Sequence, residues 1–431
     1  MISRPLTKSL FQLALSCPTK LYYEGKTEYA NAALDDPFLA SLAEGGFQVG
    51  ALAKCHFPEG IDLEDLSTQE ALEKTQELLK RESVVIFEAA FQHGPLLVRT
   101  DILEKDGQRL TINEVKAKSF RRDTECFFNR SGSLTSGWRD YIMDIAFQKY
   151  VVSRAFPDIA IETNLTLCDK DDFSPMDGLH QLFRVVKDAA DHRRVRLTAE
   201  VTSAHLHPSI LAAIRADEAC DRIFADAYEL EGKMLDFPQY VDRLAKALQN
   251  DEKVVSPIGK KCAACEFRAT QEQLAARMKC GLRECWSAQL GWTEADFLDP
   301  TVLELWNFRR KDELIAAGRA KLKDVRLSDI NITVNPDGRG LSTGQRQWLQ
   351  VEKVQNGDNE PWVDLAGLKA EMQTLRFPLH FIDFETSQAA IPFLQGHHPY
   401  EGIAFQFSHH IVEKDGSVRH AGEYLNTTPG S

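Results

Sequence analysis

Three closely spaced runs of β-branched and other apolar residues constrain the fold more than any other feature of this sequence. They are "SVVIFEAAF" (83–91), "PLLVRTDIL" (95–103) and "RLTINEVKA" (109–117), separated by "QHG" and "EKDG". Glycine with small polar neighbours between such runs is typical of tight turns. The sequence therefore predicts three adjacent strands in an antiparallel meander.

Helical patterns flank these runs on both sides. Residues 1–35 and 71–82 are predicted to be helical, the second because "ALEKTQELLKRE" is rich in strong helix formers. Apolar residues recur at helical spacing over 137–156, and Pro157 ends the pattern. Further predicted elements are a strand at 159–167 and helices at 209–216 and 240–250. Together these elements indicate an α/β fold.

The composition limits the class of protein. With 431 residues, of which 43% are hydrophobic and 27% charged, the chain can bury more than one core. No run of about 18 apolar residues lacks polar groups, so no membrane span or membrane partner is predicted. The stretch "SLFQLALSC" (9–17) faintly resembles a signal peptide, but Gln12 interrupts it. Thr7 followed by apolar residues at helical spacing fits an amphipathic opening helix better, so we expect a cytoplasmic protein.

The net charge of −13 argues against a uniformly basic coat for nucleic acid. Local basic clusters do occur, and they are either binding patches or solvated helix faces. Their members are Lys116, Lys118, Arg121 and Arg122, then Arg193, Arg194 and Arg196, and then Arg309, Arg310, Lys311, Arg319, Lys321, Lys323 and Arg326.

Two acids and a lysine on neighbouring predicted strands point to metal-ion chemistry. Asp101 and Glu114 lie on hairpin partners, which can bring both carboxylates to one cation. Such hard ligands suit Mg²⁺ or Mn²⁺, which polarise a phosphate and activate water. Lys116 shares a face with Glu114, because side chains alternate along a strand, so its ammonium can assist the attacking water. The alternative is a half-exposed sheet with ordinary charges.

Further polar residues surround this constellation. Glu88 lies on the preceding strand, and Asp140, Asp144 and Gln148 recur every four residues along the predicted helix at 137–156. "TDIL", ten residues and "EVK", followed by a helix with Gln148, resembles the RecB-like branch of the PD-(D/E)xK nuclease superfamily. The resemblance implies a restriction-endonuclease-like mixed sheet flanked by helices, with catalytic roles for Glu88 and Gln148. It also implies a histidine ligand, for which His56 stands at an unexpected spacing.

Nine cysteines in a chain without an export signal do not form a disulfide framework. Cys17 before the meander, "CAACEF" (262–267) and "CGLRECW" (280–286) after it supply four thiolates for one tetrahedral site, with Cys280 or Cys285 as the fourth ligand. Zinc is the default metal for such a site. Five cysteines are scattered and fit small buried hydrophobes: Cys55, Cys126, Cys168, Cys220 and Cys280.

The order of these cysteines is similar to that of the iron-sulphur RecB-type nucleases, among them the AddB nuclease domain and the CRISPR adaptation exonucleases. That resemblance implies a 4Fe-4S cluster in a cysteine-bearing helical subdomain that ties the two ends of the nuclease region together. Its ligands would be Cys17, Cys262, Cys265 and Cys285. The "ECW" context favours Cys285 over Cys280 as the last of them.

The carboxyl end contains a second pair of acids. "FIDFET" (381–386) places Asp383 and Glu385 on one face of a strand, the arrangement that begins RNase H-like DEDD exonucleases. Together with "PFLQGHHPYEGIAFQFSHH" it resembles a domain of unknown function that follows RecB-like nucleases. The sequence stops before two further acids, so we expect a truncated or degenerate RNase H-like fragment. The predicted organisation is a nuclease domain over 1–295, a helical and charged connection over 296–372 and this fragment over 373–431.

The function expected from these features is a Mg²⁺- or Mn²⁺-dependent hydrolase of DNA, acting on single strands from an end. Asp101 and Glu114 would hold the metal ion and Lys116 would assist the nucleophile. One alternative is a non-catalytic iron-sulphur or zinc module that binds DNA. The other is a ribonuclease, since no residue in the sequence identifies a 2′-hydroxyl reader.

Overall fold

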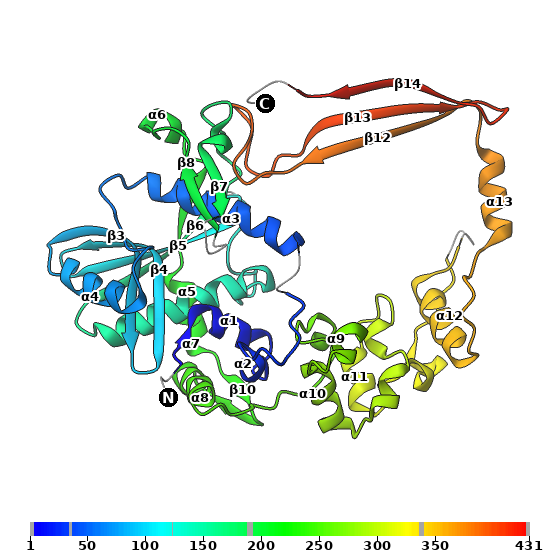
Figure 1. Ribbon diagram of the computed structural model, residues 1–431, viewed down its shortest axis with the longest axis horizontal. Helices are drawn as coiled ribbons and strands as arrows, with labels where there is room; N and C mark the ends of the chain where they lie inside the picture. The colour runs from blue at the N-terminus through cyan, green and yellow to red at the C-terminus, as the bar shows by residue number, and fades with distance from the viewer. Residues whose placement is uncertain (1–3, 34–36, 123, 188–192, 336–339, 428–431) are drawn as a thin grey trace.

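A seven-stranded mixed sheet with the row β2-β3-β4-β5-β6-β9 lies at the centre of the protein, and β1 pairs with β4 beside this row (Figure 1). The computed structural model describes residues 4–33, 37–122, 124–187, 193–335 and 340–427. β3, β4 and β5 are antiparallel neighbours and β5 is parallel to β6, so the predicted meander and the strand after it are confirmed. The strands are β1 (Leu6–Thr7), β2 (Ile61–Asp62), β3 (Ser83–His93), β4 (Leu96–Asp106), β5 (Arg109–Phe120), β6 (Ala160–Asp169) and β9 (Leu211–Arg215).

Tight turns and two helices hold the meander. Gly94 and Gly107 connect its strands with φ of 54° and 56°, the left-handed region that glycine adopts without strain. α5 (Ser136–Ala155) packs across β3, β4, β5 and β6, which confirms the helix predicted there. α4 (Thr68–Leu78) packs on β3 and begins with a capping box between Ser67 and Glu70. The principal hydrophobic core lies between the sheet and these helices.

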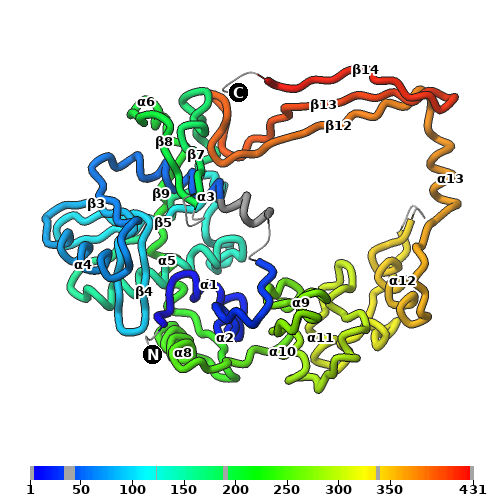
Figure 2. The backbone as a smooth tube through the Cα atoms, viewed as in Figure 1, coloured from blue at the N-terminus to red at the C-terminus, as the bar shows by residue number. Residues whose placement is uncertain are grey.

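The amino-terminal segment completes this core. Thr7 caps α1 (Lys8–Ser16), as predicted, by accepting a hydrogen bond from the backbone N–H of Leu10 at 3.3 Å. Phe11 stacks on Phe147 of α5 with ring centroids 4.4 Å apart. Of the described residues 4–33, helicity is confirmed for α1 and α2 (Lys20–Tyr23), whereas β1 is extended and residues 24–33 form turns and a bridge from Tyr29 to Lys279. In Figure 2 this segment runs beside α8, which contacts both α1 and β1.

The opposite face of the sheet is covered by α3 and by a hairpin. α3 (Pro37–Cys55) contacts β5, β7 and β8, and a second hydrophobic cluster forms between them around Leu52 and Phe183. The helix predicted at 209–216 is wrong. This segment contains β9, which pairs antiparallel with β6, so an available sheet edge outweighs the local helical pattern. The elements here are η1 (Leu179–Leu182), β7 (Phe183–Lys187), β8 (Arg193–Leu197) and α6 (Ser203–Leu206).

A separate core lies beyond the sheet. It combines Trp286 with apolar residues from Val302 to Val351, so the stretch expected as a connection supplies most of a packed helical unit and its core crosses the expected boundary at 295. α8 confirms the helix predicted at 240–250. Of the elements between β9 and the carboxyl-terminal region, α7, β10 and α8 still belong to the principal core. These elements are α7 (Asp217–Ala225), β10 (Tyr228–Leu230), β11 (Lys233–Leu235), α8 (Phe237–Gln249), η2 (Lys260–Ala264), α9 (Gln271–Ala275), α10 (Gly281–Leu290), η3 (Glu294–Leu298), η4 (Val302–Glu304), α11 (Lys311–Ala316), η5 (Leu322–Asp324), η6 (Leu327–Asp329) and α12 (Thr343–Gln355).

The carboxyl-terminal region returns to the central sheet. After α13 (Leu365–Thr374), the strands β12 (Leu379–Ser387), β13 (Ile403–Val412) and β14 (Val418–Leu425) form an antiparallel sheet that extends away from the rest (Figure 1). The loop between β12 and β13 packs on the second hydrophobic cluster, where Ile391 is buried. None of the described helices is both long enough and apolar enough to cross a membrane.

Candidate active site

The site forms where β4 and β5 separate. Their pairing ends at Ile102↔Asn113, one residue before Asp101 and Glu114. Beyond this point β1 pairs with the free part of β4. The result is a fork in the sheet with the two carboxylates at its apex. Val115 no longer pairs with a residue of β4. Its N–H donates to Oδ2 of Asp101 at 2.8 Å and fixes that carboxylate in place.

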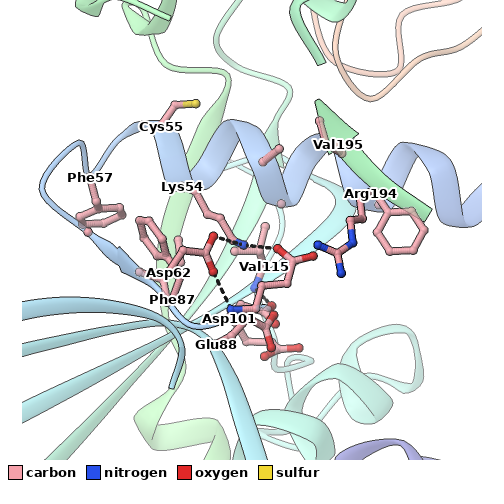
Figure 3. Close-up of a pocket in the computed structure, with 18 of the residues that line it drawn as sticks. Lys54, Cys55, Phe57, Asp62, Phe87, Glu88, Asp101, Val115, Arg194 and Val195 are labelled. Carbon is pink, nitrogen blue, oxygen red and sulfur yellow. Dashed lines mark hydrogen bonds and ion pairs between the residues drawn. The ribbon is translucent and has the colours of Figure 1, made fainter. Parts of the chain in front are cut away.

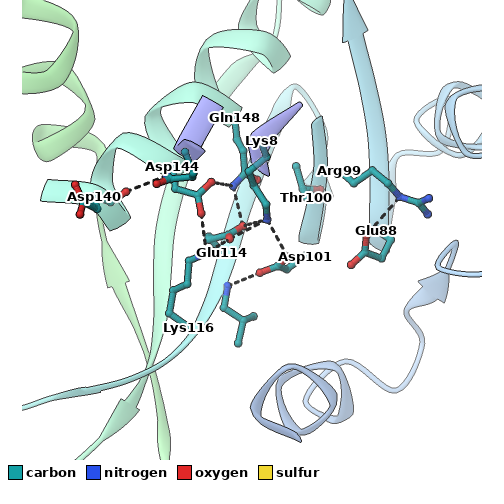
Figure 4. A network of polar contacts seen from close by, with 12 residues as sticks. Lys8, Glu88, Arg99, Thr100, Asp101, Glu114, Lys116, Asp140, Asp144 and Gln148 are labelled. Atoms are coloured by element: carbon teal, nitrogen blue, oxygen red, sulfur yellow. Dashed lines mark hydrogen bonds and ion pairs between the residues drawn. The ribbon is translucent and has the colours of Figure 1, made fainter. Parts of the chain in front are cut away.

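Glu114 is the centre of a dense polar network (Figure 4). Its side chain is 0% exposed, and it accepts from Lys8 Nζ at 2.9 Å and Lys116 Nζ at 2.7 Å. Gln148 Nε2 donates to its other oxygen at 2.8 Å. Burial alone would raise the pKa of Glu114, but the two ammonium groups outweigh it and hold the pKa well below its usual range. Glu114 is therefore a carboxylate at neutral pH.

α5 contributes the far side of this network. Lys116 Nζ also donates to Oδ2 of Asp144 at 2.6 Å, so Lys116 bridges the sheet and the helix. Burial, together with the charge of Glu114, raises the pKa of Asp144 to about 6. Gln148 is buried, and its Oε1 has no hydrogen-bond partner among the described residues. A buried oxygen without a hydrogen bond costs folding free energy. Oε1 of Gln148 is therefore free to accept from a ligand in the site.

Asp101 has a second acidic neighbour. Glu88 lies opposite Asp101 on β3, between the pairs Phe87↔Ile102 and Ala89↔Thr100, and its backbone has a φ of 56°. Burial raises the pKa of Glu88 to about 7, and the charge of Asp101 adds to the shift. Burial, and then the charge of Glu114, also raises the pKa of Asp101. These residues share one electrostatic environment.

A cavity of about 850 Å³ opens beside the fork (Figure 3). Its walls come from α3, the segment after it, the meander and β8, and they contain both cations and aromatic rings. Lys54 lies on one side, where it pairs with Asp62 at 2.9 Å. The cavity lining includes Lys8, Phe47, Lys54, Phe57, Phe87, Glu88, Asp101, Glu114, Lys116 and Arg194.

Lys8 is the functional residue that the sequence-based reasoning missed. Its Nζ lies 2.9 Å from Glu114 and 3.4 Å from Asp101. The separation in sequence is 106 residues for Glu114. A lysine directly after a helix cap gives no local sign of such a long-range contact. Only the pairing of β1 with β4 places it at the fork.

Two other expected residues lie apart from the carboxylates. His56 follows α3, and its ring meets that of His207 with centroids 6.2 Å apart. It is not among the residues that line the cavity. Asp140 is exposed at the start of α5, where its carbonyl oxygen accepts from Gln12. The structure thus brings Asp101, Glu114 and Lys116 together with Glu88, Asp144 and Gln148, but not with His56.

The donors at the fork fit a hard divalent cation. Two carboxylates and the free Oε1 of Gln148 offer oxygen, the ligand type that Mg²⁺ and Mn²⁺ prefer. No group of three or more described His, Cys, Asp and Glu side chains is already gathered around one ion position. Asp101 and Glu114 instead contact the Lys8 ammonium.

Four of the nine cysteines lie on chain segments that pack together at a second place. Cys17 ends α1, Cys262 and Cys265 lie at η2, and Cys285 lies on α10. Cys262 and Cys285 pack against the core around Trp286, and Cys265 and Cys285 pack against the aromatic cluster of Tyr23, Tyr29 and Phe267. Burial raises the pKa of Cys285. Burial likewise raises the pKa of Cys265. The chain segments around residues 17 and 262–285 are therefore adjacent.

Hydrogen bonds join these segments. Thr19 donates to the carbonyl of Val254 at 2.8 Å, and Lys20 pairs with Glu266 at 2.5 Å. The hydroxyl of Tyr23 lies 3.3 Å from Sγ of Cys285. Cys280 is different, because it is buried and its thiol accepts from the backbone N–H of Ala269 at 3.4 Å.

The acids of β12 have no comparable surroundings. Asp383 and Glu385 lie on the same strand, paired with Ser408 and Gln406 of β13, and both are exposed. Within the described part of the chain, neither carboxylate has a hydrogen-bond or ion-pair partner. Apolar neighbours on the same strand are also exposed, among them Phe384 at 56%.

Comparison with known proteins gives one match. A family model described as "Domain of unknown function (DUF2779)" matches residues 380–431. This range contains β12–β14 and the loop between β12 and β13, but none of the residues that line the cavity. No curated protein and no solved structure matches the chain.

Proposed function

We propose that the protein is a Mg²⁺- or Mn²⁺-dependent nuclease that hydrolyses phosphodiester bonds in DNA, with a restriction-endonuclease-like core of the RecB-like kind. One observation carries the proposal: buried Glu114 and half-buried Asp101 lie together at the fork between β4 and β5, with Lys116 two residues after Glu114. Each buried charge that is left uncompensated costs roughly several kcal/mol of folding free energy. A cluster of charged groups in an apolar sheet therefore indicates a function. The helix α5 supports the same site through Asp144 and Gln148.

The roles follow from the contacts. Asp101 and Glu114 would hold the cation, which supplies Lewis acidity to a phosphate oxygen and lowers the pKa of a bound water. The N–H of Val115 and the amide of Gln148 orient the two carboxylates. Lys116, held by Asp144, keeps a positive charge beside Glu114, where negative charge develops on the phosphate. Glu88, with a pKa of about 7, is able to take or give a proton at the rim of the site.

Single-stranded DNA is the proposed substrate. The cavity combines ammonium and guanidinium groups, which attract a phosphate backbone, with Phe47, which is 42% exposed and offers a stacking surface. We also propose, from the RecB-like resemblance, that the protein cuts DNA from the end of a strand. RNA would be the alternative substrate.

Cys17, Cys262, Cys265 and Cys285 would hold a 4Fe-4S cluster. The segments that carry them are in contact although Cys17 and Cys262 are 245 positions apart, which supports a structural role, because a shared cluster closes a very long loop. All nine cysteines are free thiols, which fits a reducing compartment such as the cytoplasm. We propose that β12–β14 belong to an RNase H-like region.

The cluster assignment is tested by anaerobic purification and metal analysis. We expect a brown protein with roughly four irons per chain. Cys285→Ser should lose the colour or become insoluble, whereas Cys280→Ser should keep it, since the Cys280 thiol bonds to backbone groups, the N–H of Ala269 and the carbonyl of Phe267. A colourless protein with one zinc would contradict the iron-sulphur assignment and leave a zinc site.

The nuclease assignment is tested with end-labelled single-stranded DNA and an RNA of the same sequence. The full chain should cut DNA only when Mg²⁺ or Mn²⁺ is present, and Lys116→Met should abolish cutting while retaining DNA binding. Binding without cutting by both proteins would instead identify a DNA-binding module. Preferential cutting of the RNA would identify a ribonuclease.

A further inference from the structure

The ammonium group of Lys8 lies between the two acids of the fork. Nζ is 2.9 and 3.2 Å from the two oxygens of Glu114 and 3.4 Å from Oδ1 of Asp101. Lys116 contacts Glu114 but not Asp101, since its second contact is Asp144. Among the described residues, Lys8 is the one cation that links both acids (Figure 4).

The backbone around Lys8 is firmly placed. Leu6 pairs with Leu96 of β4, and Thr7 pairs with Leu97 and caps α1. Phe11, one turn after Lys8, is fully buried against α5. The lysine stem is different, because it is 25% exposed and lines the cavity. Its four-carbon chain can therefore swing into the cavity while α1 stays in place.

A divalent cation and this ammonium cannot share the fork. A cation bound to the two carboxylates needs oxygen ligands at roughly 2.0–2.2 Å, inside the space between the acids. Lys8 Nζ already occupies that space, at hydrogen-bond distance from both carboxylates. Two positive centres within a few ångströms of each other repel strongly in a buried site. Occupation of the fork is thus exclusive.

We propose that Lys8 is a built-in counter-ion that occupies the cation position of the metal-free protein and leaves it for the cavity when Mg²⁺ or Mn²⁺ binds. The inference rests on the proposed function, since it takes the fork to be the cation site. Lys8 stabilises the buried acids before the cation arrives, and it also competes with the cation. A lysine with a merely structural role would stabilise the acids but would not compete with the cation.

The test measures Mn²⁺ binding to the full chain by titration calorimetry, without DNA, in wild type, Lys8→Met and Lys149→Met. Lys149 is a matched control, because it forms a 2.6 Å ion pair with Asp217 outside the fork. Competition predicts that Lys8→Met binds Mn²⁺ at least about tenfold more tightly, since one buried positive charge is removed. Its melting temperature without metal should fall, and the gain on adding Mn²⁺ should exceed that of wild type. Lys149→Met should bind like wild type.

A second measurement uses the wild-type protein, so it does not depend on the folding of a variant. Lysines are reductively methylated with and without saturating Mn²⁺, and the labelled peptides are quantified by mass spectrometry. Labelling of Lys8 should rise severalfold with Mn²⁺, whereas that of Lys149 should not change. Unchanged labelling of Lys8, or equal or weaker Mn²⁺ binding by Lys8→Met, overturns the inference.

The outcomes separate this inference from the proposed function. If wild type binds Mn²⁺, Glu114→Gln abolishes the binding, and Lys8→Met binds no more tightly, the cation site stands and the role of Lys8 is refuted. If neither wild type nor Lys8→Met binds Mn²⁺, the cation site and the inference are both refuted.

Discussion

Two pairs of acids lie on strands of this protein, and their surroundings differ. Asp101 and Glu114 face each other where β4 and β5 separate, and Glu114 is completely buried among cations and an amide. Asp383 and Glu385 lie on β12, exposed and, within the described residues, without a charged partner. Both pairs have the strand spacing from which a metal site is inferred.

The spacing of two acids along strands identifies candidate metal sites. The surroundings of each pair distinguish one candidate from the other. At the fork, neighbouring elements supply counter-charges, an orienting amide and a cavity. On β12 the same residue types are exposed, and no described side chain forms a hydrogen bond or an ion pair with them. The following predictions test whether this difference has the expected energetic consequences.

The largest effect on stability is expected for Glu114→Ala. This change leaves Lys8 and Lys116 close together without their shared carboxylate, and breaking a buried ion pair costs about 3–5 kcal/mol of unfolding free energy. Glu385→Ala on the exposed strand should stay within about 0.5 kcal/mol of wild type. Chemical denaturation of the metal-free proteins provides the measurement. Similar losses for the two variants would remove the distinction between the pairs.

A contrast inside the carboxyl-terminal region is expected to be nearly as large. Ile391 is 2% exposed in the loop that packs on the second hydrophobic cluster, whereas Ile382 on β12 is 52% exposed. Ile391→Ala should cost about 2–4 kcal/mol, because a buried side chain leaves a cavity. Ile382→Ala should cost less than about 0.5 kcal/mol. If Ile382→Ala is the more damaging change, β12 is covered in solution.

The acids at the fork should also shape the dependence of stability on pH. The pKa of Asp144 is raised to about 6 in the folded protein, above its unfolded value, so the folded state binds a proton more readily. The free energy of unfolding should therefore rise as pH falls from 7 towards 5, by at most about 1.4 kcal/mol per unit for one group. Asp144→Asn should flatten this slope and Asp383→Asn should not. An unchanged slope in Asp144→Asn would contradict the assigned environment.

The smallest effect is expected where the carboxyl-terminal loop touches the fork. The hydroxyl of Tyr400 donates to the carbonyl of Ala117, next to Lys116. Tyr400→Phe should cost about 1 kcal/mol, the usual value for one such hydrogen bond. Tyr424→Phe on exposed β14 is the control and should be neutral. Thermal unfolding separates the two, and equal melting temperatures would show that the loop contact contributes nothing.

Local patterns were enough to predict the meander, α5 and the shared face of Glu114 and Lys116. Alternation along β5 and a four-residue repeat on α5 suffice to bring Lys116, Asp144 and Gln148 into contact. The order of the cysteines also predicted that the two chain segments carrying them meet, and Thr19 and Lys20 do contact Val254 and Glu266, whereas the shared cluster stays a prediction.

Long-range pairing was beyond the reach of such patterns. β9 contains an apolar run that fits a helix as well as a strand, and only the free edge of β6 decides between them. Lys8 reaches the fork because β1 pairs with β4, a contact between segments about ninety residues apart. The packed unit around Trp286 is assembled from short helices whose individual patterns are too brief to be informative.

The most direct test of the central claim compares the two acid pairs in one assay. Initial rates of Mn²⁺-dependent cleavage of single-stranded DNA are measured for wild type, Asp101→Asn/Glu114→Gln and Asp383→Asn/Glu385→Gln, each confirmed to be folded. The fork variant should lose activity by roughly 10³-fold or more, because it loses both ligands of the cation that stabilises the transition state. The β12 variant should cleave at the wild-type rate. Full activity in the fork variant, or loss of activity only in the β12 variant, would contradict the assignment of the active site.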